Sequence, residues 1–278
     1  MTDGRGPRAG LEITSPANAR IKHVVALRRR RARELAGVTL VEGYAEVDLA
    51  LSAEVRPREL YYCPELGHGD PLGVLDRVTE RGGEVITVSR AAFGKIAYRE
   101  SPDGWLAVVP TVDTRLDRLD LGEQPLLLIC EGVEKPGNLG AILRTADAAG
   151  VTAVIATDPV TDWGNANLVR ASKGAVFSVP VAAAPSAQAL PWLAERGVRV
   201  AAATPDGDVL LGDADLTGPV AIAVGSETHG LSGPWLGQAD VTLRIPMFGR
   251  ADSLNVAASA AIVVYEAVRQ RMAHQRTP

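Results

Sequence analysis

The sequence has little cysteine and no long apolar run. Among its 278 residues only Cys63 and Cys130 are cysteines, which excludes a disulfide framework and a cysteine-based metal cluster. Both lie in apolar or aromatic segments, which indicates buried free thiols in a reducing compartment. No apolar stretch approaches the roughly 18 residues that span a bilayer, and MTDGRGPRAG lacks the apolar core of a signal peptide. We therefore expect a cytoplasmic globular protein with no metal site and no membrane span.

Two common nucleotide-binding signatures are also absent. In EGVEKPGNLGAILRT, Gly137 and Gly140 do not have the spacing of a G-x-G-x-x-G dinucleotide-binding loop, and no segment of the chain matches a P-loop. Pro136-Gly137-Asn138 instead predicts a tight turn that leads into a helix, whose N-terminal N–H groups can face an anion. An NAD- or nucleotide-binding protein is therefore the weaker alternative for this chain.

Acidic residues are missing from one basic segment. Residues 20–33 contain seven Arg or Lys and no Asp or Glu, although the whole chain has a net charge of −4. A dense basic stripe binds phosphates through counterion release, but a solvated helix face has the same composition. The candidate phosphate contacts of this basic stripe are Arg20, Lys22, Arg28, Arg29, Arg30 and Arg31.

The first part of the chain predicts a small α/β layer structure. Ser15-Pro16-Ala17-Asn18 supplies a helix start, and the apolar spacing that follows predicts one amphipathic helix to about Arg33. Residues 39–52 predict an apolar bend. Beyond it we expect strands over residues 59–63, 84–88 and 105–110, and helices over 71–82 and 90–98.

The second part predicts a mainly parallel sheet with helices on both faces, because nearly continuous apolar strands alternate with helical patterns. The expected strands are 126–132, 153–158, 176–181, 198–204, 220–225 and 241–246, and the clearest helices are 139–150 and 186–197. The expected domain organisation is a disordered tail over 1–12, a small α/β domain over 13–110, a polar linker over 111–123 and a larger domain over 124–278.

Polar residues gather in loops that follow the strands of the larger domain. In parallel α/β sheets, ligands collect at the carboxyl ends of the strands. The loops EGVEKPGNLGAILRT, VGSETHGLSG and IPMFGRADSLN carry Asn138, Arg144, Glu227, Ser253 and Asn255, and ATPDGD adds a fourth polar loop. We therefore expect these side chains to meet in one site.

Structural roles compete with functional ones at the same residues. Arg144 is also suited to an ion pair with Asp147, three residues later on the same helix, or to extension into solvent. Glu227 is equally suited to cap a neighbouring helix, and Ser253 to cap the long apolar helix that follows it. His229 invites assignment as a general base, but no partner for it can be identified from sequence.

Three segments, in this order, resemble the motifs of the SpoU (TrmH-like) branch of the SPOUT RNA 2′-O-ribose methyltransferases. EGVEKPGNLGAILRTADAAG is similar to the first motif, with Asn138 and Arg144 at its functional polar positions. VGSETHGLS resembles the second, with Glu227, and IPMFGRADSLNVAASAAIVVYEA the third, with Ser253 and Asn255. RASKGAVFSVPV also matches a family segment between the first two motifs.

The resemblance extends to the N-terminal region and includes three departures. Residues from SPANARIKHVVALRRR to LVEGYAEVDLAL look like the ribosomal-protein-L30e-like substrate-binding domain of many family members. Glu131 stands where the family often has Asp, and Ser226 where Asn is common. Lys173 replaces a small residue, which points to a different RNA contact.

The resemblance implies a cofactor, a topology and a partner. Family members bind S-adenosyl-L-methionine in a C-terminal trefoil knot and work as homodimers through this domain. The implied cofactor contacts are Thr204, Gly225, Ile245, Met247, Ser253 and Leu254. Backbone groups of these loops would bind the adenine, ribose and amino-acid parts, and the apolar side chains would enclose the adenine. The long helix after Asn255 would be apolar all round because it is buried.

The resemblance also implies methyl transfer to a ribose 2′-hydroxyl of RNA. The arginine at the position of Arg144 has been assigned as the general base, but a guanidinium is very hard to deprotonate. We expect Arg144 to hold the adjacent phosphate and favour the alkoxide, while Asn138 and Ser253 or Asn255 position the ribose. Glu227 would orient Asn138 or Arg144.

The preferred target is 23S ribosomal RNA, because the N-terminal region looks like that of rRNA-modifying relatives. A tRNA target and a non-catalytic RNA-binding assembly factor are the alternatives, and a role in antibiotic resistance stays open.

Overall fold

The computed structural model describes residues 11–67, 69–70 and 72–274. They form two compact units. The first contains the described residues up to Thr111 together with Gly164–Phe177, and the second contains Val112–Trp163 and the described residues from Ser178 onward. The tail that we expected over residues 1–12 lies outside the description up to residue 10, whereas residues 11 and 12 belong to a strand.

The first unit is built on a five-stranded mixed sheet in the order β1-β4-β3-β5-β2. β1, β4 and β3 are parallel, and β5 runs antiparallel to both β3 and β2. The strands are β1 (Leu11–Ile13), β2 (Val38–Glu42), β3 (Glu59–Tyr62), β4 (Glu84–Val88) and β5 (Trp105–Pro110).

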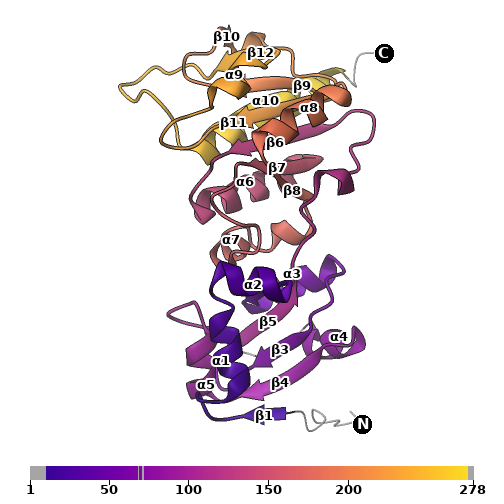
Figure 1. The fold of residues 1–278 in the computed structure, drawn as a ribbon, viewed down its shortest axis with the longest axis vertical. Coiled ribbons are helices and arrows are strands. Elements are labelled where there is room, and N and C mark those ends of the chain that lie inside the picture. Colours follow the sequence, from indigo (N-terminus) through magenta and orange to yellow (C-terminus); the bar gives the residue numbers. More distant parts are fainter. Residues whose placement is uncertain (1–10, 68, 71, 275–278) are drawn as a thin grey trace. The chain divides into compact units, whose positions relative to one another are not determined.

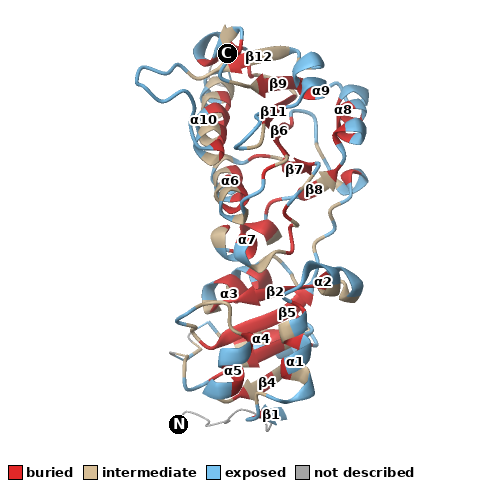
Figure 2. Ribbon diagram, turned by 60° about the vertical axis from the view of Figure 1, so that its left-hand side comes forward, coloured by how far each residue is buried: buried red, intermediate tan, exposed pale blue. Residues whose placement is uncertain are grey.

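Helices cover both faces of this sheet (Figures 1 and 2). They are α1 (Ala19–Ala26), α2 (Arg30–Ala36), α3 (Tyr44–Ser52), α4 (Val74–Glu80) and α5 (Arg90–Ile96). On one face, Val24 of α1 and Phe93 of α5 join a core with Leu40 of β2. α3 and α4 pack together on the opposite face. Because side chains alternate along a strand, β2 contributes to both cores, and all of its residues are buried.

A segment from the middle of the chain also belongs to the first unit. It comprises α7 (Ala166–Ala171) and the 3-10 turn η2 (Ala175–Phe177). α7 packs against β2, and η2 packs against α3. Residues 176–181, which we expected to form a strand, are therefore divided between this turn and the start of β8 (Val181–Ala184) in the second unit. Only Val181, the last residue of the expected strand, lies in β8, so this prediction was wrong, and α7 was not anticipated.

The basic stripe does not form a single helix, contrary to our expectation. α1 ends at Ala26, and α2 starts at Arg30. The side chain of Arg33, which is buried, turns back and donates hydrogen bonds to the carbonyl oxygens of Leu27 at 3.2 Å and Arg28 at 2.9 Å. The guanidinium of Arg33 thus supplies hydrogen bonds to carbonyl groups at the end of α1 and stabilises the break between α1 and α2. Hydrophobic periodicity alone had placed Arg33 in one continuous helix.

The apolar bend predicted over residues 39–52 was also wrong. This stretch forms most of β2 and the whole of α3, joined at Gly43. Gly43 has φ of +118°, and a Cβ atom there would lie 2.1 Å from a carboxylate oxygen of Glu46. Glycine therefore permits a sharp strand-to-helix turn within an apolar run. The other strands and helices expected in this unit are present: β4 and β5 have the expected bounds, and β3, α4 and α5 are shorter than expected.

The second unit is a seven-stranded parallel sheet in the order β10-β12-β9-β11-β6-β7-β8. Its strands besides β8 are β6 (Leu126–Glu131), β7 (Ala153–Thr157), β9 (Arg199–Ala203), β10 (Val209–Leu210), β11 (Val220–Val224) and β12 (Val241–Arg244). β10 was not anticipated, and β8 overlaps the strand expected over residues 176–181 only at Val181. The expected parallel α/β sheet is confirmed, and it places the loops after β6, β9, β11 and β12 at one edge.

Two layers of helices enclose this sheet, as Figure 2 shows. α6 (Pro136–Ala149) and α10 (Val256–His274) pack against each other on one face, and α8 (Ser186–Glu195) and α9 (Gly233–Gly237) pack together on the other. The 3-10 turns η1 (Leu116–Arg118) and η3 (Leu211–Asp213) complete the unit. Leu116 of η1 is buried in the core beneath α8, so part of the expected linker packs with the second unit.

We expected α10 to be buried on every side, but one of its faces is exposed. Val256, Ala260, Val263 and Val264 are buried against the unit, whereas Ile262, Tyr265 and Met272 are exposed. Apolar residues occupy both faces, but only one face packs against other parts of the chain that the structure describes.

Both cysteines are buried and free, as predicted. Burial raises the pKa of Cys63, and it raises the pKa of Cys130 to about 12. Within the described residues, no helix is long and apolar enough to cross a membrane, and no group of three or more His, Cys, Asp or Glu side chains is arranged to hold a metal ion.

The last turns of α10 are fastened to the sheet by Arg271. Its guanidinium donates to the carbonyl oxygens of Gln124 and Pro125, both at 2.9 Å, and to that of Gly218. Burial lowers the pKa of this arginine. The planar guanidinium donates to carbonyl groups just before β6 and just before β11 at the same time, which a lysine ammonium cannot do.

Replacing Arg271 with alanine should destabilise the second unit by about 1–3 kcal/mol, because several carbonyl groups lose a charged donor. Arg271→Lys should recover only part of this loss. Arg269→Ala on the same helix is the control, because Arg269 forms an exposed pair with Glu266 that should contribute less than about 1 kcal/mol. Urea unfolding followed by circular dichroism measures the free energies, and equal effects of the two alanine variants would contradict the role given to Arg271.

Candidate active site

A cleft of about 690 Å³ opens at the carboxyl edge of the second sheet. It lies among the loops that follow β9, β11 and β12, with Lys135 from the loop after β6. Its lining includes Thr204, Gly225, Glu227, Ile245, Met247, Ser253, Leu254 and Asn255. Residues from segments far apart in sequence are thus brought together where the parallel topology predicts a ligand site.

The loop after β11 folds back on itself. Ser226 and Gly230 exchange two backbone hydrogen bonds, of 3.1 and 3.0 Å, and the Ser226 hydroxyl accepts from the backbone of His229. A Cβ atom on Gly225 would lie only 1.9 Å from the backbone of Gly230. No side chain fits at Gly225, so the cleft wall consists of closely packed backbone.

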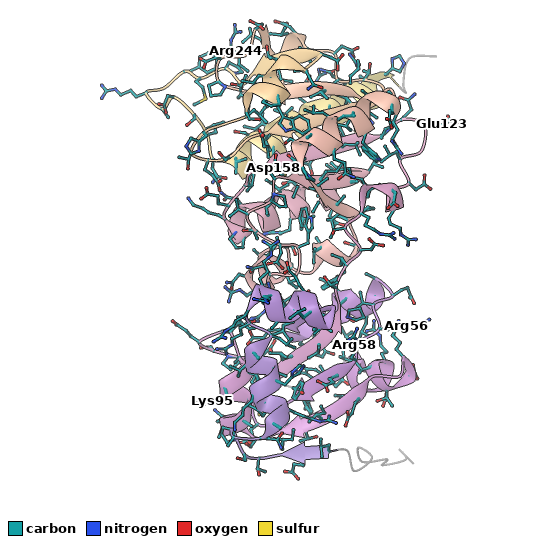
Figure 3. All side chains as sticks on the ribbon, viewed as in Figure 1. Arg56, Arg58, Lys95, Glu123, Asp158 and Arg244 are labelled. Carbon is teal, nitrogen blue, oxygen red and sulfur yellow. The ribbon has the colours of Figure 1, made fainter. Side chains whose placement is uncertain are left out.

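The neighbouring loop after β9 is fastened to β12 in a similar way. The N–H of Thr204 donates to the carbonyl of Leu243 at 3.0 Å, and a Cβ atom on Gly207 would lie 2.4 Å from the backbone of Leu243. Arg244, labelled in Figure 3, donates to the carbonyl oxygens of Gly207 and Asp208. The cleft is therefore bordered by a loop with a fixed backbone.

Asn138 connects three loops through its side-chain amide. Its Nδ2 donates to Oε1 of Glu227 at 2.5 Å, and its Oδ1 accepts from Nδ2 of Asn255 at 3.2 Å. Asn138 lies in the first turn of α6, where Pro136 occupies the first position, so the tight turn that we expected is the start of the helix. The predicted meeting of Asn138, Glu227 and Asn255 is present in the structure.

The helix cap at the start of α10 is Asn255, not Ser253. Oδ1 of Asn255 accepts a hydrogen bond from the N–H of Ala257 at 3.0 Å, and α10 begins at Val256. The capping role that we considered for Ser253 is therefore performed by Asn255. Ser253 is exposed and lines the cleft. Asn255 uses its oxygen for the cap and its nitrogen for Asn138, so one side chain fixes both the helix start and the loop contact.

The carboxylate of Glu227 is held in its ionised form. Partial burial acts to raise its pKa, but hydrogen bonds from its own backbone N–H, from Asn138 and from the N–H of Glu134, together with the charge of Lys135, lower the pKa below the ordinary value. Glu227 therefore remains an acceptor throughout the neutral range. Its side chain accepts hydrogen bonds from Asn138 and from the N–H of Glu134, and it caps no helix among the described residues.

Glu131, at the end of β6, supports the same loop from below. This buried carboxylate accepts hydrogen bonds from the N–H of Ser232 at 2.7 Å and from its hydroxyl at 2.5 Å. Ser232 precedes α9, so Glu131 connects β6 to the chain that follows the β11 loop. An aspartate, shorter by one methylene, could not span the same distance without a backbone shift.

Arg144 lies outside the cleft lining, in the third turn of α6. It is exposed and makes no hydrogen bond or ion pair with the described residues. Asp147, the expected structural partner, instead accepts a hydrogen bond from Ser178 at 3.2 Å. Six helical residues separate Arg144 from Asn138, a rise of about 9 Å, and long helical side chains point toward the N-terminal turn. The guanidinium is thus free to meet an anion near the Asn138 end of α6.

Sequence reasoning missed several polar residues of the cleft. Lys135, Asp206, Thr228, Asp252 and Ser259 also line it. Four of these residues could have been predicted from sequence, because all except Ser259 lie in the polar loops that follow strands. The cleft also includes His229, whose N–H is used within the loop.

The basic stripe of the first unit contains two kinds of residue. Arg20 pairs with Glu84 at 2.7 Å, Arg30 pairs with Glu34, and Arg28 donates to the carbonyls of Lys95 and Ala97 while lying over the Tyr98 ring. The side chains of Lys22, Arg29 and Arg31 are exposed and have no partner among the described residues. Arg20 and Arg30 are paired with carboxylates, whereas this second group has no acidic partner among the described residues.

The fold is that of a known enzyme family. The model of the SpoU rRNA Methylase family matches residues 125–265, and that of the MRM3-like substrate binding domain matches residues 18–107. The chain belongs to the SpoU rRNA methylase family, which confirms the resemblance inferred from the three motifs.

Individual relatives match nearly the whole chain. A 23S rRNA (uridine(2479)-2′-O)-methyltransferase of Streptomyces viridochromogenes is 34% identical, over 98% of this chain and 97% of that protein. The 23S rRNA (guanosine(2553)-2′-O)-methyltransferase RlmP of Bacillus subtilis is 29% identical, over 91% of this chain and 98% of that protein. An AdoMet-bound rRNA methyltransferase from Sinorhizobium meliloti is similar in structure, with a TM-score of 0.85, 32% identity and coverage of 93% of this chain and 97% of that one.

The pairing of Glu227 with Asn138 predicts a specific pH response. Asn138→Ala removes a donor and should raise the pKa of Glu227, and Asn138→Asp should raise it further because a second carboxylate faces the first. In the unchanged protein, the contact should persist as the pH falls through about 5 and be lost only as the pH passes the lowered pKa.

Carbon-13 NMR titration of the Glu227 carboxyl group measures the three pKa values. An unchanged pKa in Asn138→Asp would show that the two side chains are not paired in solution.

Proposed function

We propose that this chain is an S-adenosyl-L-methionine-dependent methyltransferase that modifies a ribose 2′-hydroxyl of 23S ribosomal RNA. The observation that carries the proposal is the hydrogen-bonded series Glu227–Asn138–Asn255, which joins the three motif loops beside the cleft. Family membership and relatives named as 23S rRNA 2′-O-methyltransferases support the same activity. Such a substrate also supports a cytoplasmic location.

The residues of the cleft fit the cofactor. A cavity of about 690 Å³ lies within the range usual for small-molecule sites, about 300–1,000 Å³. Ile245, Met247 and Leu254 supply apolar walls for the adenine, and the close-packed backbone at Gly225 and Thr204 supplies hydrogen-bonding groups. A neighbour of similar fold was solved with AdoMet bound. When bound, this cofactor supplies an electrophilic methyl group on a sulfonium, which is a good leaving group.

The residues of this chain position the hydroxyl and stabilise its developing charge. Ser253 and Asn255, at the rim of the cleft, position the ribose together with Asn138, whose amide Glu227 holds in one orientation. Arg144 holds the neighbouring phosphate, and its positive charge lowers the free energy of the alkoxide-like transition state. A guanidinium is too weak an acid to serve as the base at neutral pH, so Arg144 acts electrostatically.

The domain roles follow from this assignment. Residues 13–110 recognise the RNA and residues 124–278 carry the reaction, with 111–123 between them. The match to a substrate binding domain over residues 18–107 supports the first role. The return of the chain from β12 to α10, which packs against α6 and β11, is compatible with the trefoil knot of the family.

The protein works as a homodimer through its C-terminal domain. The exposed apolar face of α10, with Ile262, Tyr265 and Met272, supports this assembly, because a long apolar helix face in water favours burial against another chain. Ala258 on the same side permits close approach of a second helix.

Arg144→Ala should abolish methyl transfer while changing the cofactor dissociation constant by less than about twofold, because Arg144 lies outside the cleft lining. Arg144→Lys keeps a charge but loses the bidentate fork, and should retain a small fraction of the rate. Incorporation of tritium from labelled S-adenosyl-L-methionine into RNA measures transfer, and calorimetric titration measures cofactor affinity. Equal loss of both in Arg144→Ala would refute this division of roles.

The test of the function itself compares total RNA from cells with and without the gene. Mapping of 2′-O-methyl groups should reveal one position in 23S rRNA that depends on the protein. A position in tRNA would replace the proposed substrate, and RNA binding without any transfer would favour an assembly factor.

The unpaired cations of the basic stripe should account for the salt dependence of RNA binding. Changing Lys22, Arg29 and Arg31 to glutamine should reduce the slope of log affinity against log salt by about 2–3, because each phosphate contact contributes about 0.7–0.9. The matched control is Arg20→Gln with Arg30→Gln, two residues whose charges are already paired. Filter binding at several salt concentrations measures the slope. Equal changes in both variants would show that ion pairing within the protein does not decide which arginines and lysines contact RNA phosphates.

A further inference from the structure

Phe248 is the most exposed aromatic residue among those described. Its side chain is 95% exposed, whereas Phe93, Trp105 and Trp235 are fully buried, and Tyr265 is only half exposed. The chain has few aromatic residues, 4% of the total. The ring contributes little to the core of the folded unit, so it is available to contact a ligand.

The ring stands at the rim of the candidate active site. Met247, the residue before it, lines the cleft, and so do Asp252 and Ser253 at the other end of the same loop. Since consecutive Cα atoms lie about 3.8 Å apart, Phe248 is within one residue of the cleft wall. It does not line the cleft itself, so the cofactor cavity does not use it.

The surroundings of the ring favour a nucleic-acid ligand. Arg250 follows two residues later, is exposed, and makes no ion pair with the described residues. An exposed aromatic side chain two residues from an unpaired arginine is a combination that proteins use to hold single-stranded RNA, with the base stacked on the ring and the phosphate held by the cation. A lipid or apolar peptide would require more apolar residues next to the ring, but Gly249, Arg250 and Asp252 flank it.

We propose that Phe248 is a stacking platform for an unpaired base of the RNA substrate, at or next to the nucleotide whose ribose enters the cleft. The inference rests on the proposed function, because it assumes an RNA strand at this site. Stacking on this ring would position the strand so that its 2′-hydroxyl faces Asn138 and Ser253. Arg250 would hold a phosphate of the same segment.

Three substitutions separate an aromatic role from an apolar one. Phe248→Leu keeps the apolar volume without the ring, Phe248→Tyr keeps the ring, and Phe248→Ala removes both. With deproteinised 23S rRNA from cells lacking the gene as substrate, Phe248→Leu and Phe248→Ala should raise KM for RNA roughly 5- to 100-fold, the range expected for loss of one stacked base. Phe248→Tyr should restore most of the lost affinity.

Two further readouts show whether the ring acts through the cofactor site or through contact with a second copy of the chain. Calorimetric titration with S-adenosyl-L-methionine should give the same dissociation constant for all variants, since Phe248 lies outside the cavity. Sedimentation velocity should give the same oligomeric state. If Phe248→Leu matches the unchanged protein in KM, or if it alters the oligomeric state because the ring packs on a second copy, the proposal is overturned.

A binding measurement keeps this inference separate from the proposed function. Phe248→Trp introduces an indole at the exposed position, while Trp105 and Trp235 are buried. Adding the same 23S rRNA should quench the extra emission, obtained by subtracting the spectrum of the unchanged protein, even if no methyl group is transferred. RNA binding without quenching would refute the stacking platform, whereas quenching without methyl transfer would refute only the enzymatic function.

Discussion

The amide of Asn138 is the contact on which the candidate site depends. It holds loops that follow three different strands, because its nitrogen donates to Glu227 and its oxygen accepts from Asn255. Each partner is fixed by other interactions: Glu227 by donors that keep it ionised, and Asn255 by its cap on α10. An amide has a donor at one end and an acceptor at the other, so neither aspartate nor leucine could replace it.

Close backbone contacts set the positions of the cleft walls. Gly225 lies against Gly230, and Gly207 against Leu243, with no space for a side chain at either glycine. The parallel sheet brings the loops to one edge, and these contacts determine how far each loop extends over it. Ser253, which lines the same cleft, comes from the loop that follows β12.

The sequence predicted the parallel sheet, its strand segments and most of the site, because buried parallel strands are recognisable as apolar runs and polar loops follow them. It did not predict the break between α1 and α2, since the cause is the side chain of Arg33 folding back on Leu27. The strand-to-helix turn at Gly43 was hidden inside an apolar run. Both features depend on one residue, through a side-chain hydrogen bond at Arg33 and a positive φ at Gly43, which hydrophobic periodicity does not reveal. The free state of Arg144 and the pairing of Arg20 also lay beyond sequence, because both depend on which charges the fold brings together.

The membership of α7 in the first unit has a consequence for dissecting this protein. Leu168 and Val169 are buried there, although the chain on either side of Gly164–Phe177 belongs to the second unit. A single cut after Thr111 would therefore not yield two intact halves. The C-terminal fragment would contain α7 without β2, so the buried side chains of α7 would be exposed and would favour aggregation. The N-terminal fragment would contain β2 without α7, so one side of β2 would be exposed. The two units are interleaved along the chain, so neither can be produced intact as one continuous segment without the other.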